Sequence, residues 1–429
     1  MLVSFSCSNY MSIDSEQRLL LTTSYRPNEI PGNVIDQKVP GMSGISYLKG
    51  AALYGANASG KSNFLTAVDF MRKYVYKSAT QMDPTGGTGV LPFLLNTEAN
   101  EKPSTFEVTF VHEGVRYDYG FSLNQKQILS EWLYSYPYGK SRTIFERTKE
   151  ERSDKYTYKY GNKRAAFSDL EKKTRDNALF LSVGVQFNVE EFKAPYEWLV
   201  NHLIILDLSG EGMPSRFSAR KFYEKPDIQN MFIKLIREAD LGIEGVEVDL
   251  SKFDDKKLIK PDDVPDIVHK YVVSKMKEED IYEVRFLHSS QDVDRPVKFD
   301  FGLESGGTQR FFSLIAPWLD VLENGWTMFV DELESSLHPL LVQKLISMIN
   351  SEANQNGAQL IFTTHNTSLL DFKLLRRDQI WFTEKDQGGA TRLYPLTDYR
   401  PRNDESLEKG YLAGRYGAIP MLGGFFVNE

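Results

Sequence analysis

The chain has 429 residues, of which 41% are hydrophobic and 26% are charged, values typical of globular proteins that argue against long disordered segments. The net charge of −8 excludes a general attraction to nucleic acid or to anionic membranes. Cys7 is the single cysteine, which excludes an intramolecular disulfide and a thiolate metal cluster. Apolar runs long enough for a membrane span and an N-terminal secretory signal are both missing. We therefore expect a cytoplasmic protein with no membrane partner.

The first 50 residues predict strands and loops. Residues 1–13 begin with a strand pattern and then reach the polar turn Asn9-Tyr-Met-Ser12. Three prolines interrupt residues 14–50, where we expect strands and loops without a long helix.

A phosphate-binding loop follows a short apolar strand at residues 45–54. The pattern is Gly55-x-x-x-x-Gly60-Lys61-Ser62, in which the glycines let successive N–H groups face one anion. Lys61 is expected to reach the β- and γ-phosphates and Ser62 to bind Mg²⁺, with further nucleotide contacts from Asn57 and Asn63. Apolar residues at helical spacing over 64–75 predict a helix directly after the loop, whose N-terminus adds partial positive charge.

Three strands are predicted after a polar loop at residues 78–89. Segments 104–111, 115–123 and 128–136 are rich in aromatic and β-branched residues, and the first two are separated by the turn sequence His112-Glu-Gly114. This spacing predicts an antiparallel meander.

Residues 137–175 are basic, with twelve Lys and Arg against six Asp and Glu, and aromatic residues are interspersed among them. Such a stretch is a candidate contact for DNA or for an acidic protein. The alternative, which we favour, is a solvated hairpin with lysines on one face and tyrosines on the other. Helices are predicted at 228–239 and 264–277, and the lack of sustained heptads excludes a long coiled coil.

A second helix N-terminus with glycine amides occurs about 240 residues after the first. Paired strands at 282–287 and 297–301 lead to Ser305-Gly306-Gly307, where Ser305 is a good N-cap for a helix that ends near Gly325. A single triphosphate needs only one anion-binding loop of this kind. We therefore expect Ser305, Gly306 and Gly307 to contact the γ-phosphate bound by a neighbouring subunit.

Two further strands are expected to deliver catalytic groups at their ends. The strand at 326–330 is followed by Asp331, a candidate Mg²⁺ ligand, and Glu332, a candidate base for the attacking water. The strand at 359–363 leads to His365, which would face the crevice where open α/β sheets bind ligands. We predict that His365 contacts the γ-phosphate.

This ordered set of motifs resembles the ABC-type ATPase head, in particular its SMC and double-strand-break-repair branch. The segment Asn9–Ser12 is similar to one that helps hold the nucleotide in that branch, with Met11 in place of a basic residue. The signature is similar to Ser-Gly-Gly-Gln, with Thr308 in place of glutamine. The resemblance implies a nucleotide contact by Asn9, and it leaves Gln81 as a weak candidate for the glutamine that links the lobes.

The chain also resembles stand-alone ATPases of bacterial anti-phage operons, such as the RloA type and the AriA subunit of PARIS. Residues 239–243 and 409–420 are similar to segments of that group. The resemblance implies an ATP- and Mg²⁺-dependent homodimer or higher oligomer that senses a phage protein and controls an effector, commonly a nuclease from the same operon.

We accordingly predict an α/β fold, a two-lobed P-loop ATPase head without a long coiled coil. Its expected parts are an N-terminal ATPase lobe (1–130), an inserted region with the basic hairpin and helices (131–280), and a C-terminal lobe (281–429). The β-meander is also predicted to be an insertion in the head. Two alternatives stay open: a DNA-clamping ATPase of repair or genome maintenance, and the motor subunit of a transporter.

Overall fold

The structure is a computed structural model that describes residues 1–24, 29–150, 153, 155–161, 164–206, 213–239, 242–251, 280–290, 295–402 and 405–420. Contacts along the chain divide it into two units. Unit 1 comprises Met1–Asp207, Val321–Ser335 and Val342–Glu429, and unit 2 comprises Leu208–Asp320 and Ser336–Leu341. The domain boundaries that we predicted at residues 130 and 280 describe lobes of an ATPase head, and they stay a prediction.

A seven-stranded antiparallel sheet in unit 1 contains the predicted meander. Its strand order is β10-β9-β8-β7-β6-β1-β2. His112 pairs with Val115 across a tight turn in which Glu113 and Gly114 both have positive φ, so the predicted turn is confirmed. The strands are β1 (Leu2–Ser8), β2 (Gln17–Leu20), β6 (Ser104–His112), β7 (Val115–Leu123), β8 (Ile128–Tyr136), β9 (Arg142–Lys149) and β10 (Tyr156–Tyr160).

A six-stranded, mostly parallel sheet forms the second layer of unit 1, in the order β11-β15-β16-β5-β17-β18. The central neighbours β15, β16 and β5 are parallel, so their carboxyl ends meet at one edge of the sheet. Its strands are β5 (Gly50–Gly55), β11 (Leu203–Leu206), β15 (Thr327–Val330), β16 (Gln359–Thr364), β17 (Ile380–Lys385) and β18 (Thr391–Pro395). A separate pair is formed by β3 (Val34–Ile35) and β4 (Tyr47–Leu48).

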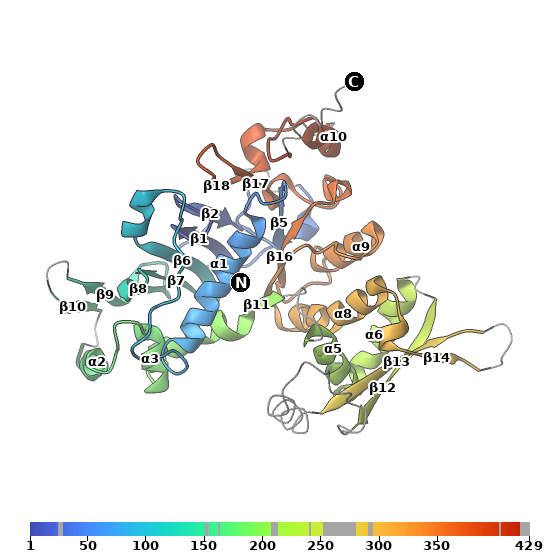
Figure 1. Ribbon diagram of the computed structural model, residues 1–429, viewed down its shortest axis with the longest axis horizontal. Coiled ribbons are helices and arrows are strands. Elements are labelled where there is room, and N and C mark those ends of the chain that lie inside the picture. Colours follow the sequence, from blue (N-terminus) through green and yellow to red (C-terminus); the bar gives the residue numbers. More distant parts are fainter. Residues whose placement is uncertain are drawn as a thin grey trace, which may run out of the picture. The chain divides into compact units, whose positions relative to one another are not determined.

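Helix α1 (Lys61–Lys77) packs between the two sheets of unit 1. Its buried side chains include Phe64, Val68 and Met71, which belong to the predicted apolar stripe. They share one hydrophobic core with Phe5 of the antiparallel sheet and Leu53 of the parallel sheet, and Figure 1 shows α1 beside β1, β6 and β5. The core therefore fixes the start of α1 at the end of β5.

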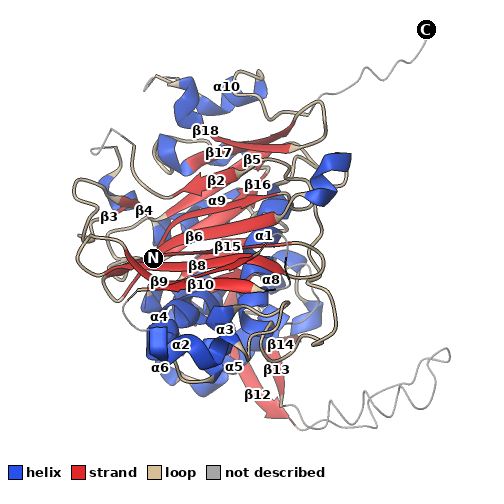
Figure 2. Ribbon diagram, turned by 90° about the vertical axis from the view of Figure 1, so that its left-hand side faces the viewer, coloured by secondary structure: helices blue, strands red, loops and turns tan. Residues whose placement is uncertain are grey.

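The other helices of unit 1 pack against its sheets and strands. Phe180 of α3 packs edge to face on Phe145 of β9, with ring centroids 5.0 Å apart. Figure 2 shows α10 next to β17 and β18. No helix in the described part of the chain is long and apolar enough to cross a bilayer. These helices are α2 (Arg164–Glu171), α3 (Phe180–Gln186), α4 (Glu190–Glu197), α9 (Pro339–Ile349, which begins in unit 2) and α10 (Leu407–Leu412).

The described residues of unit 2 include a three-stranded antiparallel sheet and the helices α5, α6 and most of α8, which surround an aromatic core. Phe312 contacts Phe232 and Phe286 at 5.1 and 5.5 Å between ring centroids. The predicted strand pair and the helix predicted at 228–239 are confirmed, whereas the helix predicted at 264–277 lies outside the described residues. The elements are α5 (Met213–Glu224), α6 (Pro226–Glu238), β12 (Ile243–Ser251), β13 (Ile281–His288), β14 (Val297–Asp300) and α8 (Gly306–Asn324, which ends in unit 1). Together, the sheets and helices of both units confirm the predicted α/β fold class.

Candidate functional site

The phosphate-binding loop lies where the sequence predicts it, between the end of β5 and the start of α1. Lys61 is buried and folds back over the loop, where its Nζ donates hydrogen bonds to the carbonyl oxygens of Gly55 (2.9 Å) and Ala56 (3.1 Å). Burial lowers the pKa of Lys61, and the negative charges of Asp331 and Glu332 partly oppose this shift. The ammonium group is thus held at the loop by carbonyl oxygens that an anion could replace.

Both glycines of the loop are required by close contacts. A Cβ at Gly55 would lie 2.4 Å from the carbonyl oxygen of Thr383, and one at Gly60 would lie 2.0 Å from Oγ1 of Thr391. Gly60 also has φ of 106°, a conformation that side chains rarely adopt. Asn57 is exposed in the middle of the loop. The backbone N–H groups can therefore approach an anion closely.

The acidic pair follows β15 and is oriented by a threonine from the neighbouring strand. The hydroxyl of Thr363 donates to Oδ1 of Asp331 (2.5 Å) and accepts the backbone N–H of Glu332 (2.8 Å). Glu332 is exposed and has φ of 47°. The Asp331 carboxylate and the Ser62 hydroxyl are oxygen donors of the kind that Mg²⁺ prefers. Sequence reasoning missed Thr363, which has no recognisable motif of its own.

His365 follows β16 and is exposed at the same edge of the sheet. Its backbone N–H donates to the carboxylate of Glu334, a second residue that sequence reasoning missed. Partial desolvation of the ring and the positive charge of Lys61 lower the pKa of His365, although nearby carboxylates partly oppose this shift. The lowered pKa favours the neutral imidazole, which can both donate and accept hydrogen bonds.

These groups come together because β15, β16 and β5 are adjacent parallel strands. Asp331, His365 and Gly55 each stand at the carboxyl end of one of them. Such an edge is where open α/β sheets bind ligands. The structure thus brings a lysine, two carboxylates and an imidazole together around a phosphate-binding loop.

Two asparagines near the loop have their side chains engaged within the protein. The Asn9 amide donates to the carbonyl oxygen of Lys102 (2.7 Å) and accepts the N–H of Phe93 (3.0 Å), and Asn9 is only 3% exposed. Asn63 donates to Oγ of Ser12 (2.7 Å). The Asn9 side chain therefore has a structural role, and nucleotide contacts by Asn9 and Asn63 stay predictions.

The signature segment belongs to unit 2 and is described apart from the phosphate-binding loop. Oγ of Ser305 accepts the backbone N–H of Thr308 (3.1 Å), which confirms the predicted N-cap of α8. A Cβ at Gly307 would lie 2.7 Å from the carbonyl oxygen of Ser336. The first turn of α8 thus contains Gly306 and Gly307, and Ser305 caps it.

The structure contradicts Gln81 as the lobe-linking glutamine. Helix α1 runs from Lys61 to Lys77, and Gln81 lies in the turn beyond its far end. At about 1.5 Å per residue, the 17-residue helix alone separates its two ends by roughly 25 Å. Gln81 therefore cannot reach a metal or phosphate at the loop.

Part of the basic stretch, β9 and β10, forms a hairpin as we favoured on sequence grounds, at the edge of the seven-stranded sheet, and residues 164–171 form α2. β9 and β10 pair with Tyr158 opposite Arg147, and the rings of Tyr158 and Phe180 lie 5.2 Å apart. Arg147 is fully buried and donates to the carbonyl oxygen of Ala178 (2.7 Å), while Lys159 pairs with Glu146 (3.1 Å). The aromatic residues are thus part of the core, and part of the positive charge is compensated within the protein.

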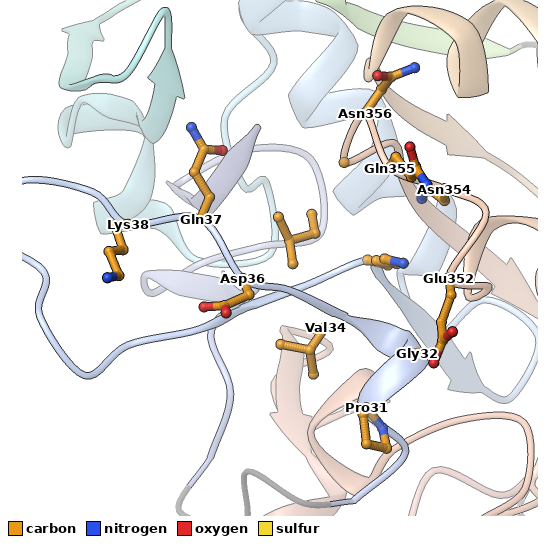
Figure 3. Close-up of a pocket in the computed structure, with 13 residues that line it drawn as sticks. Pro31, Gly32, Val34, Asp36, Gln37, Lys38, Glu352, Asn354, Gln355 and Asn356 are labelled. Atoms are coloured by element: carbon orange, nitrogen blue, oxygen red, sulfur yellow. The ribbon is translucent and has the colours of Figure 1, made fainter.

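A polar pocket of about 560 Å³ lies at the opposite edge of the parallel sheet (Figure 3). Lys49, which directly precedes β5, lines it together with Asp36, Lys38 and Glu352. The Lys49 ammonium group donates to the carbonyl oxygen of Ser351 (2.6 Å). This pocket is separate from the phosphate-binding loop, which lies at the carboxyl end of β5.

Comparisons with solved structures found SMC head domains. The head domain from Thermotoga maritima is 12% identical, with 92% of this chain and 98% of that chain covered and a TM-score of 0.40. An SMC head bound to the C-terminal winged-helix domain of ScpA is 12% identical over 95% and 99% of the two chains, with a TM-score of 0.46. An SMC head with an extended coiled coil, bound to the C-terminal domain of ScpA derived from Pyrococcus furiosus, is 11% identical over 96% and 98%, with a TM-score of 0.39.

No curated protein matches the chain at a significant level. A family model described as "AAA domain, putative AbiEii toxin, Type IV TA system" matches residues 51–371. The matched range begins within β5, just before the phosphate-binding loop, and ends after His365, so it contains every group gathered at the sheet edge. The chain therefore belongs to this AAA family of P-loop nucleotide-binding proteins.

Proposed function

We propose that the protein binds Mg-ATP at the edge of its parallel sheet and hydrolyses it. The observation that carries this proposal is the convergence of the phosphate-binding loop, the acidic pair and His365 at the ends of three adjacent strands. A lone glycine-rich turn would indicate anion binding only. A carboxylate that can activate water beside the loop indicates phosphoryl transfer to water.

Each residue has a distinct role in the proposed reaction. Lys61 would leave the loop carbonyl oxygens and bind the β- and γ-phosphates, and Ser62 and Asp331 would hold Mg²⁺, whose charge would offset that of the phosphates. Glu332 orients the attacking water and accepts its proton. His365 would donate a hydrogen bond from its ring to the γ-phosphate, where negative charge is greatest.

Dimerisation around ATP is the second part of the proposal. The N-terminus of α8 offers the amides of Gly306 and Gly307 and the hydroxyl of Ser305, a combination suited to an anion. We assign these groups to the γ-phosphate held by a second copy of the chain. ATP would then stabilise the closed pair by mass action, and hydrolysis would release it.

The cellular role that we propose is regulation within an anti-phage, abortive-infection system. The protein would act as a sensor that responds to a phage component and controls an effector, in our proposal a nuclease from the same operon. The support is the family description, which names a putative AbiEii toxin of a type IV toxin–antitoxin system. Each ATP-bound pair would be one state of the switch, and the released subunits the other.

The decisive test is the substitution Glu332→Gln, which keeps the shape of the side chain and removes its basicity. We expect the ATP turnover number to fall by about 100-fold or more, since general-base catalysis contributes this much. Phosphate release measures turnover, and equilibrium binding of a fluorescent ATP analogue should be preserved.

Two further variants control this test. Glu323→Gln changes an exposed glutamate near the end of α8 and should leave turnover unchanged. Lys61→Ala should abolish analogue binding itself. Turnover at the wild-type rate in Glu332→Gln would refute the role of Glu332.

A further inference from the structure

Residues 405–420, here called the C-terminal segment, form a small structure held by its own side chains. Ser406 caps α10, and the hydroxyl of Tyr411 donates to the carbonyl oxygen of Ala418 (3.0 Å). The hydroxyl of Tyr416 donates to Glu405 (2.8 Å). A Cβ at Gly410 would lie 2.8 Å from that same hydroxyl, so the fold of the segment needs a glycine there. The segment is therefore a built element with a defined shape.

The C-terminal segment packs on the strand that leads into the phosphate-binding loop. The ring of Tyr411 contacts Tyr54 edge to face at 5.9 Å, and Tyr54 directly precedes Gly55. The same ring stacks on Phe382 of the neighbouring strand at 5.6 Å. Figure 2 shows the segment's helix α10 beside β17 and β18. The segment thus supports β5 immediately before the loop.

The C-terminal segment also holds the turn that follows His365. The hydroxyl of Thr367 donates to Oε1 of Glu408 on α10 (2.7 Å). Asn366 accepts the N–H of Ser368 (3.0 Å), which shapes the same turn. On its other side, the backbone N–H of His365 donates to Glu334. The backbone of His365 is thus held by Glu334 from the acidic loop, and Thr367, two residues later, is held by Glu408.

Two buried polar atoms lie at this junction without a hydrogen-bond partner among the described residues. They are the Tyr54 hydroxyl and Oε2 of Glu334. Burial raises the pKa of Tyr54 well above its ordinary value, and the negative charge of Glu334 adds to this effect. Unpaired buried polar atoms cost free energy. A small displacement of the C-terminal segment that changes the surroundings of these two atoms would therefore change the energy of its contact with β5 and the acidic loop.

We propose that Glu408 is a positioning residue for His365, and that the C-terminal segment sets the rate of ATP hydrolysis without touching the nucleotide. The segment joins the strand before the phosphate-binding loop to the turn after the histidine. A displacement of α10 therefore changes where the imidazole stands relative to the bound phosphates. This inference rests on the proposed ATPase function.

Thr367→Val tests the inference because it removes the hydroxyl that donates a hydrogen bond to Glu408 and keeps the size of the side chain. We expect kcat for ATP to fall about tenfold, as for the loss of one hydrogen bond to a charged group, while KM changes less than about twofold. Thr367→Ser restores the hydroxyl and should recover kcat. Adding Glu408→Ala to Thr367→Val should lower kcat no further, because both changes break one interaction.

A matched control removes another threonine–glutamate hydrogen bond. Thr157→Val deletes the contact of Thr157 with Glu150 (3.1 Å) in the β9–β10 hairpin and should leave kcat unchanged. Wild-type kcat in Thr367→Val would overturn the inference. A fall in kcat that Thr367→Ser fails to recover would overturn it as well.

Amide hydrogen exchange over residues 365–370 separates this inference from the ATPase proposal. If wild type and Lys61→Ala release phosphate equally slowly, the ATPase proposal fails. The rate of amide exchange then tests by itself whether Glu408 positions the turn after His365. We expect Thr367→Val to speed exchange at these amides without lowering the melting temperature by more than a few degrees. Unchanged exchange would overturn the inference irrespective of turnover.

Discussion

The sheet edge around the phosphate-binding loop and the β9–β10 hairpin are both rich in charged residues, yet they use charge in opposite ways. At the edge, Lys61 at the start of α1 lies near Asp331 and Glu332, which follow β15, and Glu332 stays exposed. In the hairpin, Arg147 is buried against Glu131, and Lys159 is paired with Glu146. Charge density alone therefore does not identify a functional site. What distinguishes the edge is that its charged groups converge where a ligand can enter.

The buried charges beside the hairpin have a structural task. Glu131 of β8 is fully buried, and its carboxylate accepts the N–H groups of Phe180 (2.6 Å) and Leu181 (3.0 Å) at the start of α3. Arg147 lies 3.9 Å from it, and its guanidinium group stacks on Tyr156. Burial raises the pKa of Glu131, and the charge of Arg147 opposes this shift. The pair thus joins the antiparallel sheet to the first turn of a helix.

Removing a buried charge beside the hairpin is expected to lower the stability of the protein and to leave ATP hydrolysis unchanged. Glu332→Gln is expected to do the reverse. Glu131→Ala leaves the buried Arg147 unpaired and removes the acceptor of two backbone N–H groups. We expect the free energy of unfolding to fall by about 3–5 kcal/mol, measured by urea denaturation. The folded fraction should hydrolyse ATP at the wild-type rate.

Glu146→Ala provides the control for this stability measurement, because it removes a partly exposed glutamate from the same hairpin. It should cost less than about 1 kcal/mol. If Glu131→Ala were as stable as Glu146→Ala, the structural role of the buried pair would be wrong.

A smaller effect is expected from the exposed lysines of the hairpin. Lys140, Lys155 and Lys159 are exposed, so changing all three to Gln should alter the free energy of unfolding by less than about 1 kcal/mol. Turnover should also be unchanged. The measurement that sharpens the comparison is ATP-dependent binding to a DNA duplex at low and high salt. Salt-sensitive binding by wild type that disappears in the triple variant would favour the DNA-clamp alternative.

Much of the fold was predictable because its strongest patterns are local. The aromatic and β-branched residues of three neighbouring segments located the meander, and the glycines around Lys61 located the start of α1. Asp331 and His365 were predictable because each follows an apolar strand. The exclusion of Gln81 was also within reach of the sequence, since the apolar stripe over 64–75 already implies a helix that carries position 81 away from the loop.

The residues that sequence reasoning missed act through tertiary contacts. Thr363 orients Asp331 from a neighbouring strand, and Glu334 reaches the backbone of His365. Glu408 meets Thr367 across 41 positions of the chain. None of these contacts follows from spacing, because each depends on which strands and helices become neighbours in the fold.

The central claim is that a second copy of the chain completes the site. The direct test is the molar mass in solution of the Glu332→Gln variant, by light scattering with and without Mg-ATP. We predict a monomer of 49.1 kDa without nucleotide and about twice that mass with it. Adding Ser305→Arg should abolish the dimer while ATP still binds, whereas the control Thr157→Arg should not. A molar mass that does not change when Mg-ATP is added, or a dimer that persists in the Ser305→Arg variant, would contradict the claim.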